Sequence, residues 1–135
     1  MKKLLVMPLI CCLMLVARSA SAQDFTYNAN FVYARADAGV KLPANTYSQW
    51  VLSWAPQGNL TSCSIQVDTS SDGVTWTSGG LFASTPCTNP SLTSVRVKGL
   101  PQPLTGGYVR INVTALQGNS VVGLNASLQG WSTAF

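Results

Sequence analysis

Regular alternation of apolar and polar residues, in five stretches, most limits what this chain can fold into. In QWVLSW, Trp50, Leu52 and Trp54 fall on one side, and Val51 and Ser53 fall on the other. The inward residues of the other four stretches are Cys63, Ile65, Val67; Val95, Val97; Val109, Ile111, Val113; and Val122, Leu124, Ala126, Leu128. A period of two is typical of antiparallel strands that have one buried and one solvated face.

Segments rich in Gly, Pro and Asn separate these stretches. They are PQGN at 56–59, TPCTNP at 85–90, LPQPLTGG at 100–107 and QGNS at 117–120. Such segments do not lie in central strands. Residues 23–39 give the least clear pattern, because FTYNANFVYA suits either one edge strand or two short ones. We therefore predict one all-β domain, an antiparallel, jelly-roll-like β-sandwich.

The first 22 residues have the pattern of a secretory signal peptide. Lys2 and Lys3 precede an apolar run at 4–17, and small residues occupy Ala20, Ser21 and Ala22. We predict cleavage after Ala22, a mature domain over 23–135, and a secreted protein, periplasmic or extracellular. The short Lys-Lys signal indicates a bacterial source.

Two alternatives for this segment are weaker. The apolar run is short for an uncleaved membrane anchor, which needs about 20 residues. Lipidation of Cys11 or Cys12 is disfavoured, because the preceding Ile10 or Cys11 is not small. We expect no membrane span in the mature chain.

Removal of the signal peptide nearly cancels the charge of the chain. The formal charge of +4 includes Lys2, Lys3 and Arg18. Five basic residues and four aspartates then remain, which gives +1. This balance gives no support for a nucleic-acid partner, which needs a clustered basic face.

The mature chain keeps two cysteines, Cys63 and Cys87. In an oxidising compartment such a pair is expected to form a disulfide. The alternative is two buried free thiols.

The stretch DTSSDG, at 68–73, suits either a calcium loop or a strand-to-strand turn. Asp68, Ser70, Asp72 and Gly73 match the first ligand positions and the glycine of an EF-hand loop. The twelfth position, however, is Gly79 rather than glutamate, and the flanks alternate like strands. We therefore predict a hairpin in which CSIQVDT pairs with VTWTS, with Gly73 in the left-handed region. A weak surface metal site at Asp68, Ser70 and Asp72 is the alternative.

The longer stretch SIQVDTSSDGVTWT, at 64–77, together with GGYVRINVTAL at 106–116, resembles the discoidin (coagulation factor 5/8 C-terminal) group of galactose-binding-like domains. The matching positions are Ser70, Asp72, Gly73, Trp76, Tyr108, Val109 and Arg110. The resemblance covers about half of the mature chain and implies an extracellular β-sandwich whose relatives bind glycans, lipids or proteins. It transfers no ligand-binding residue, because the family's binding loops have no clear match here.

The chain lacks the groups that most enzymes use. It contains no histidine and no glutamate, and disulfide formation removes the last free thiols. Ser-His-Asp and Cys-His arrangements are therefore impossible, and zinc lacks its usual ligands. We predict a non-catalytic protein with no cofactor.

The aromatic residues divide into a core group and a candidate ligand-contact group. Trp50, Trp54 and Trp76 lie on the inward phase of their strands and are expected in the core. The candidate ligand contacts are Trp131, Tyr27, Tyr33 and Tyr47. Flat aromatic rings beside amides can bind sugars, so we predict a secreted carbohydrate-binding module.

Two further expectations concern partners. Arg96, Lys98 and Arg110 point outward by phase, and would form a basic stripe if their strands were neighbours. The alternative function is a structural or adhesive subunit of an extracellular surface assembly, favoured by the low charge and the apolar GWSTAF terminus. The expected partner is accordingly a glycan or a surface protein.

Overall fold

The computed structural model describes residues 25–43, 46–88, 93–98 and 104–132, and the predicted signal peptide lies outside these ranges. Eleven strands occur within them. These are β1 (Phe25–Phe31), β2 (Arg35–Ala36), β3 (Val40–Lys41), β4 (Thr46–Tyr47), β5 (Gln49–Gln57), β6 (Leu60–Ser70), β7 (Thr77–Pro86), β8 (Thr93–Lys98), β9 (Leu104–Thr105), β10 (Tyr108–Gly118) and β11 (Gly123–Trp131). The uncertain N-terminal pattern thus resolves into one edge strand, β1, and two short pieces after it.

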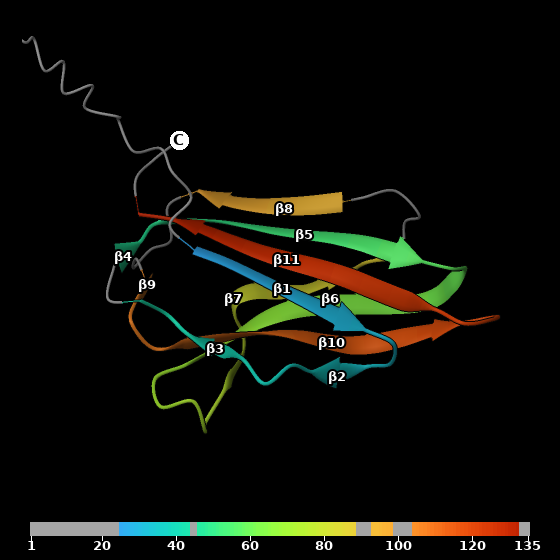
Figure 1. The fold of residues 1–135 in the computed structure, drawn as a ribbon, viewed down its shortest axis with the longest axis horizontal. Helices are drawn as coiled ribbons and strands as arrows, with labels where there is room; N and C mark the ends of the chain where they lie inside the picture. The colour runs from blue at the N-terminus through green and yellow to red at the C-terminus, as the bar shows by residue number, and fades with distance from the viewer. Residues whose placement is uncertain (1–24, 44–45, 89–92, 99–103, 133–135) are drawn as a thin grey trace, which may run out of the picture.

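The long strands form two antiparallel sheets and run along the long axis of the molecule (Figure 1). Sheet A has the order β1-β11-β5-β8, and sheet B has the order β2-β10-β6-β7, with β3 also on β10. The connections β5–β6 and β10–β11 pass from one sheet to the other, and β4 pairs with β9. This architecture confirms the predicted all-β antiparallel sandwich.

The core lies between the sheets and includes most of the residues that the alternation placed inward. Trp50, Leu52 and Trp54 from β5 are at most 3% exposed. Side chains from β6 and β10 of the facing sheet, and from the neighbouring β11, are buried with them, namely Ile65, Val67, Val109, Ile111, Val113, Leu124, Ala126 and Leu128. Each large apolar side chain removed from water contributes about 1.5–3 kcal/mol to folding.

A disulfide joins Cys63 of β6 to Cys87, which directly follows β7. The Cys87 N–H also donates to the Cys63 carbonyl at 3.0 Å. The bridge therefore closes the open end of the β6–β7 hairpin, and the predicted pairing is confirmed.

The β6–β7 hairpin confirms the predicted chain reversal, but its turn is longer than expected. Strand β7 begins at Thr77, so residues 71–76 form the connection. Gly73 has a φ of 77°, and Asp72 Oδ1 accepts hydrogen bonds from the Val74 and Thr75 N–H groups at 2.8 Å. Asp72 therefore caps the turn.

Some side chains are placed differently from what the strand alternation predicts. Gln66 and Asp68 occupy the outward positions of β6 but are 5% and 0% exposed, because partners from β7 and β10 surround them. Trp76 was expected in the core but is only partly buried. It precedes β7, so the alternation of that strand does not apply to it.

Candidate functional site

Two of the four candidate ligand contacts are buried, which corrects the expected exposure. Tyr27 is 8% exposed because it lies on the inward phase of β1, and Tyr47 is 0% exposed. The Tyr47 ring packs against Trp50, with 5.2 Å between centroids. Tyr33 is 59% exposed in the β1–β2 connection, and Trp131 is partly exposed at the end of β11.

The predicted basic stripe does not form. Arg96 and Lys98 belong to β8, at the edge of sheet A, whereas Arg110 belongs to β10 in sheet B. The Arg110 guanidinium instead lies 4.4 Å from the Trp76 ring centroid and donates from Nε to Asp68 at 2.9 Å. The three basic residues do not share one face because β8 pairs into sheet A and β10 pairs into sheet B.

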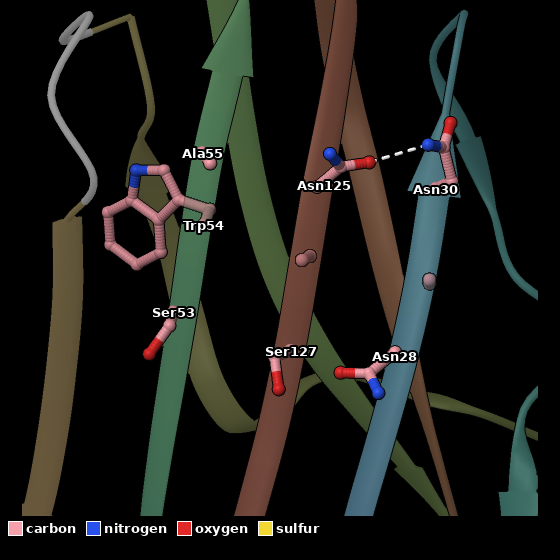
Figure 2. A pocket seen from close by; sticks show the side chains of 9 residues that line it. Asn28, Asn30, Ser53, Trp54, Ala55, Asn125 and Ser127 are labelled. Carbon is pink, nitrogen blue, oxygen red and sulfur yellow. Dashed lines mark hydrogen bonds between the residues drawn. The ribbon is translucent and has the colours of Figure 1, made fainter.

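A hollow lies on the outer face of sheet A, and we call it the trough (Figure 2). The register sets the rows of outward residues that line it. Asn30 lies opposite Asn125, which lies opposite Ala55. In the next row, the residues are Asn28, Ser127 and Ser53, with Ser94 of β8 opposite Ser53.

The trough exists because the side chains at its centre are short. Ser53, Ala55 and Ser127 reach only a little above the sheet, and the longer Asn28 and Asn30 stand at the β1 side. The space measures about 420 Å³, and Ala29, Trp54 and Ala126 complete the lining. Asn30 Nδ2 donates to Asn125 Oδ1 at 2.5 Å, which ties β1 to β11 along one border.

The trough is uncharged, and most of its accessible lining is apolar, with polar groups from asparagine and serine side chains. Three primary amides and two hydroxyls offer both hydrogen-bond donors and acceptors. None of its nine lining residues carries an ionisable side chain. Such a surface suits a neutral ligand with many hydroxyl groups.

Local sequence patterns do not distinguish the trough residues. Asn28, Asn30, Asn125 and Ser127 are outward positions of alternating strands, a place usually occupied by ordinary solvated residues. The available signal was the number of short polar side chains in NAN at 28–30 and NAS at 125–127. That signal gains meaning only when the register of β1 on β11 is known.

A second hollow of about 380 Å³ lies beside the β6–β7 turn. Hydroxyl residues of β6, β7 and β9 line it, but Ser70 Oγ already donates to the Thr75 carbonyl at 2.5 Å and accepts from the Gly73 N–H at 2.9 Å. The Ser70 hydroxyl in the wall of this hollow is therefore already engaged in hydrogen bonds within the turn.

Asp68 is the centre of a buried polar cluster on the outer side of sheet B. Its Oδ2 accepts from Arg110 Nε and Asn112 Nδ2, each at 2.9 Å. Its Oδ1 accepts from Gln66 Nε2 at 2.6 Å and from the Gly79 N–H at 2.9 Å. Four donors thus occupy this carboxylate, and among the described residues no group of three or more metal-ligating side chains gathers.

Residues of the discoidin-like stretches meet around this cluster. Trp76 stacks on Arg110, and a Cβ built on Gly73 would lie 3.2 Å from the Tyr108 ring. Trp76, Arg110, Gly73 and Tyr108, four of the matched residues, therefore pack against one another in pairs and help to hold the turn against β10.

Hydrogen bonds lower the pKa of three aspartates. Burial opposes ionisation of Asp68, but the Gly79 N–H, Arg110, Gln66 and Asn112 outweigh it and hold its pKa below the ordinary value.

The Asp37 and Asp72 carboxyls behave in the same way. At Asp37, burial again opposes ionisation, but hydrogen bonds from Tyr27 and the Ala38 N–H outweigh it and lower the pKa. The Thr75 and Val74 N–H groups lower the pKa of Asp72. Burial, and then the hydrogen bond to Asp37, raise the pKa of Tyr27 well above its usual range.

The titratable groups of this chain predict that its stability changes little with pH near neutrality and falls at both extremes. Without histidine or glutamate, no side chain titrates between about pH 5 and pH 8, so the free energy of unfolding should stay constant there. Below about pH 4 the unfolded state binds more protons than the folded state, so stability should fall. Above about pH 10 the unfolded chain loses the Tyr27 proton first, and stability should fall again.

Urea unfolding at a series of pH values measures this profile. A sigmoidal change centred between pH 6 and pH 7 would contradict the assignment of these groups.

Comparison with known proteins does not assign a family. No family model matches the chain, and no curated protein matches it. Two solved structures are similar: a chain of the acidic stable capsid of Helicobacter pylori bacteriophage KHP30, and the SPBc2 prophage-derived protein YomS.

Both similarities are low. The capsid chain is 16% identical with a TM-score of 0.45, over 84% of this chain and 94% of that one. YomS is 14% identical with a TM-score of 0.39, over 82% of this chain and 98% of that one.

Across the described ranges, no helix has the length and apolarity that a membrane crossing requires. The discoidin-like resemblance stays a prediction. The structure establishes the antiparallel β-sandwich fold, and no family is assigned.

Proposed function

We propose that this protein is a secreted, non-catalytic module that binds carbohydrate in the trough of sheet A. The observation that carries the proposal is the uncharged lining of the trough, which combines three amides and two hydroxyls with apolar groups on the outer face of sheet A. Sugars present hydroxyls at their edges and apolar C–H groups on their faces, so both parts of this lining have a counterpart. The predicted export and the disulfide suit a protein that meets glycans outside the cell.

Removal of the trough amides should weaken binding. The double variant Asn28→Ala/Asn125→Ala loses two hydrogen-bonding side chains, each contributing about 0.5–1.5 kcal/mol, so affinity for a retained polysaccharide should fall about tenfold. Affinity electrophoresis of the purified protein in gels containing neutral polysaccharides measures the effect. The matched control is Asn119→Ala, an exposed amide in the β10–β11 turn. Equal retention of all three proteins would contradict a binding site in the trough.

A second candidate function is that of a subunit in a surface assembly. Val32, Tyr33 and Val121 are 64%, 59% and 93% exposed. They lie at one end of the sandwich, because Phe31 is opposite Leu124 in the β1–β11 pair. Exposed apolar residues that gather in this way favour contact with another protein. Sedimentation at increasing concentration distinguishes the two functions, since a binding module stays monomeric and an assembly subunit associates.

A further inference from the structure

We infer that the ligand is an uncharged glycan chain of several sugar units that lies along β11 from the trough to Trp131. This inference rests on the proposed function and specifies the class and the direction of the ligand. Two observations carry it independently of each other: the neutrality of the trough, and the position of Trp131 on the same face of sheet A.

The absence of charge in the trough lining defines the class of the ligand. An acidic glycan binds where basic side chains compensate its carboxylates or sulfates, and the nine lining residues include none. Amides both donate and accept hydrogen bonds, so Asn28 and Asn125 can match hydroxyl groups in either role. Ala55 and the short serines leave the centre of the trough open to the apolar face of a sugar ring.

Strand alternation places Trp131 on the outer face with the trough residues. Asn125, Ser127, Gln129 and Trp131 are successive outward positions of β11, and their inward neighbours Leu124, Ala126 and Leu128 are buried. Trp131 lies four positions after Ser127, which corresponds to about 14 Å along the strand. This distance exceeds the length of one sugar unit, so a ligand that touches both positions must be a chain.

The two contacts have different chemistry and therefore different roles. The trough supplies hydrogen bonds that hold one sugar unit in a defined orientation. Trp131 is partly exposed, so a more distant unit can contact the accessible part of its aromatic ring. Shorter ligands reach only the trough, whereas longer ones gain the second contact.

A length series tests the inference. The full-length purified protein is titrated calorimetrically with cello-oligosaccharides and chito-oligosaccharides of two to six units, and with oligogalacturonates as the acidic comparison. We expect affinity for one neutral series to rise with length to about four units and to stay unchanged between low and high salt. Trp131→Leu keeps apolar bulk without the flat ring. It should lower the affinity for the longest oligosaccharides roughly tenfold and leave the affinity for the disaccharide unchanged. The control is Asn119→Ala, the exposed amide in the β10–β11 turn, which lies outside both contacts.

Each other outcome has a defined meaning. Stronger, salt-sensitive binding of oligogalacturonates, affinity that does not depend on length, or an equal effect of Trp131→Leu on short and long ligands would overturn the inference and leave the proposed function standing. Failure of all three series to bind would overturn both.

Discussion

Asp68→Ala is expected to lower the free energy of unfolding by roughly 3–5 kcal/mol, the usual effect of removing one member of a buried ion pair. The Asp68 side chain is 1% exposed, and its partner Arg110 is 24% exposed. Loss of the carboxylate leaves the Arg110 charge and the donors of Gln66, Asn112 and Gly79 without their acceptor. Because a domain of this size has a total stability of about 5–15 kcal/mol, the effect is large.

Guanidinium unfolding followed by tryptophan fluorescence measures this loss. Asp68→Asn, which keeps the shape of the side chain, extends the test if the alanine variant does not fold, and it should be destabilised to a smaller extent. Asp72→Ala is the matched control, because Asp72 is exposed in the turn and should cost much less. Equal destabilisation by Asp68→Ala and Asp72→Ala would show that the cluster does not stabilise the fold.

The double variant Cys63→Ala/Cys87→Ala is expected to lose about 3 kcal/mol of stability. The disulfide spans 24 residues and restricts the unfolded chain over that length. Alanine is the suitable replacement because both cysteines are buried, at 6% and 0% exposure, and serine would add a buried hydroxyl.

Thermal unfolding with and without a reducing agent provides the control. The reductant should lower the unfolding midpoint of the wild-type protein and leave that of the double variant unchanged. A double variant as stable as the wild-type protein would contradict a stabilising role for the bridge.

The fold was predictable because local alternation determines which residues face inward. Val109, Ile111 and Val113 of β10 alternate with partly exposed or exposed neighbours, and all three are at most 1% exposed. The Asp72-Gly73 pair likewise identified the hairpin from adjacent residues alone. These are properties of short segments, which a single sequence contains.

Features that depend on pairing between distant segments were not predictable. Asp68 is buried because Arg110 and Asn112, more than forty residues later, lie beside it. The trough likewise requires Asn28 of β1 to lie opposite Ser127 of β11. Tyr27 is similar, because its hydroxyl donates to Asp37 across a connection whose path the local pattern did not define. In each case the residue types were visible, but their neighbours were set by sheet topology.

The trough is built from side chains of three hydrogen-bonded strands rather than from loops. Its shape therefore exists before any ligand arrives, and complex formation requires little loss of conformational entropy from the protein. The entropy loss on association then falls mainly on the ligand. Among glycans with the same hydroxyl pattern, those with the stiffest linkages should consequently bind most tightly.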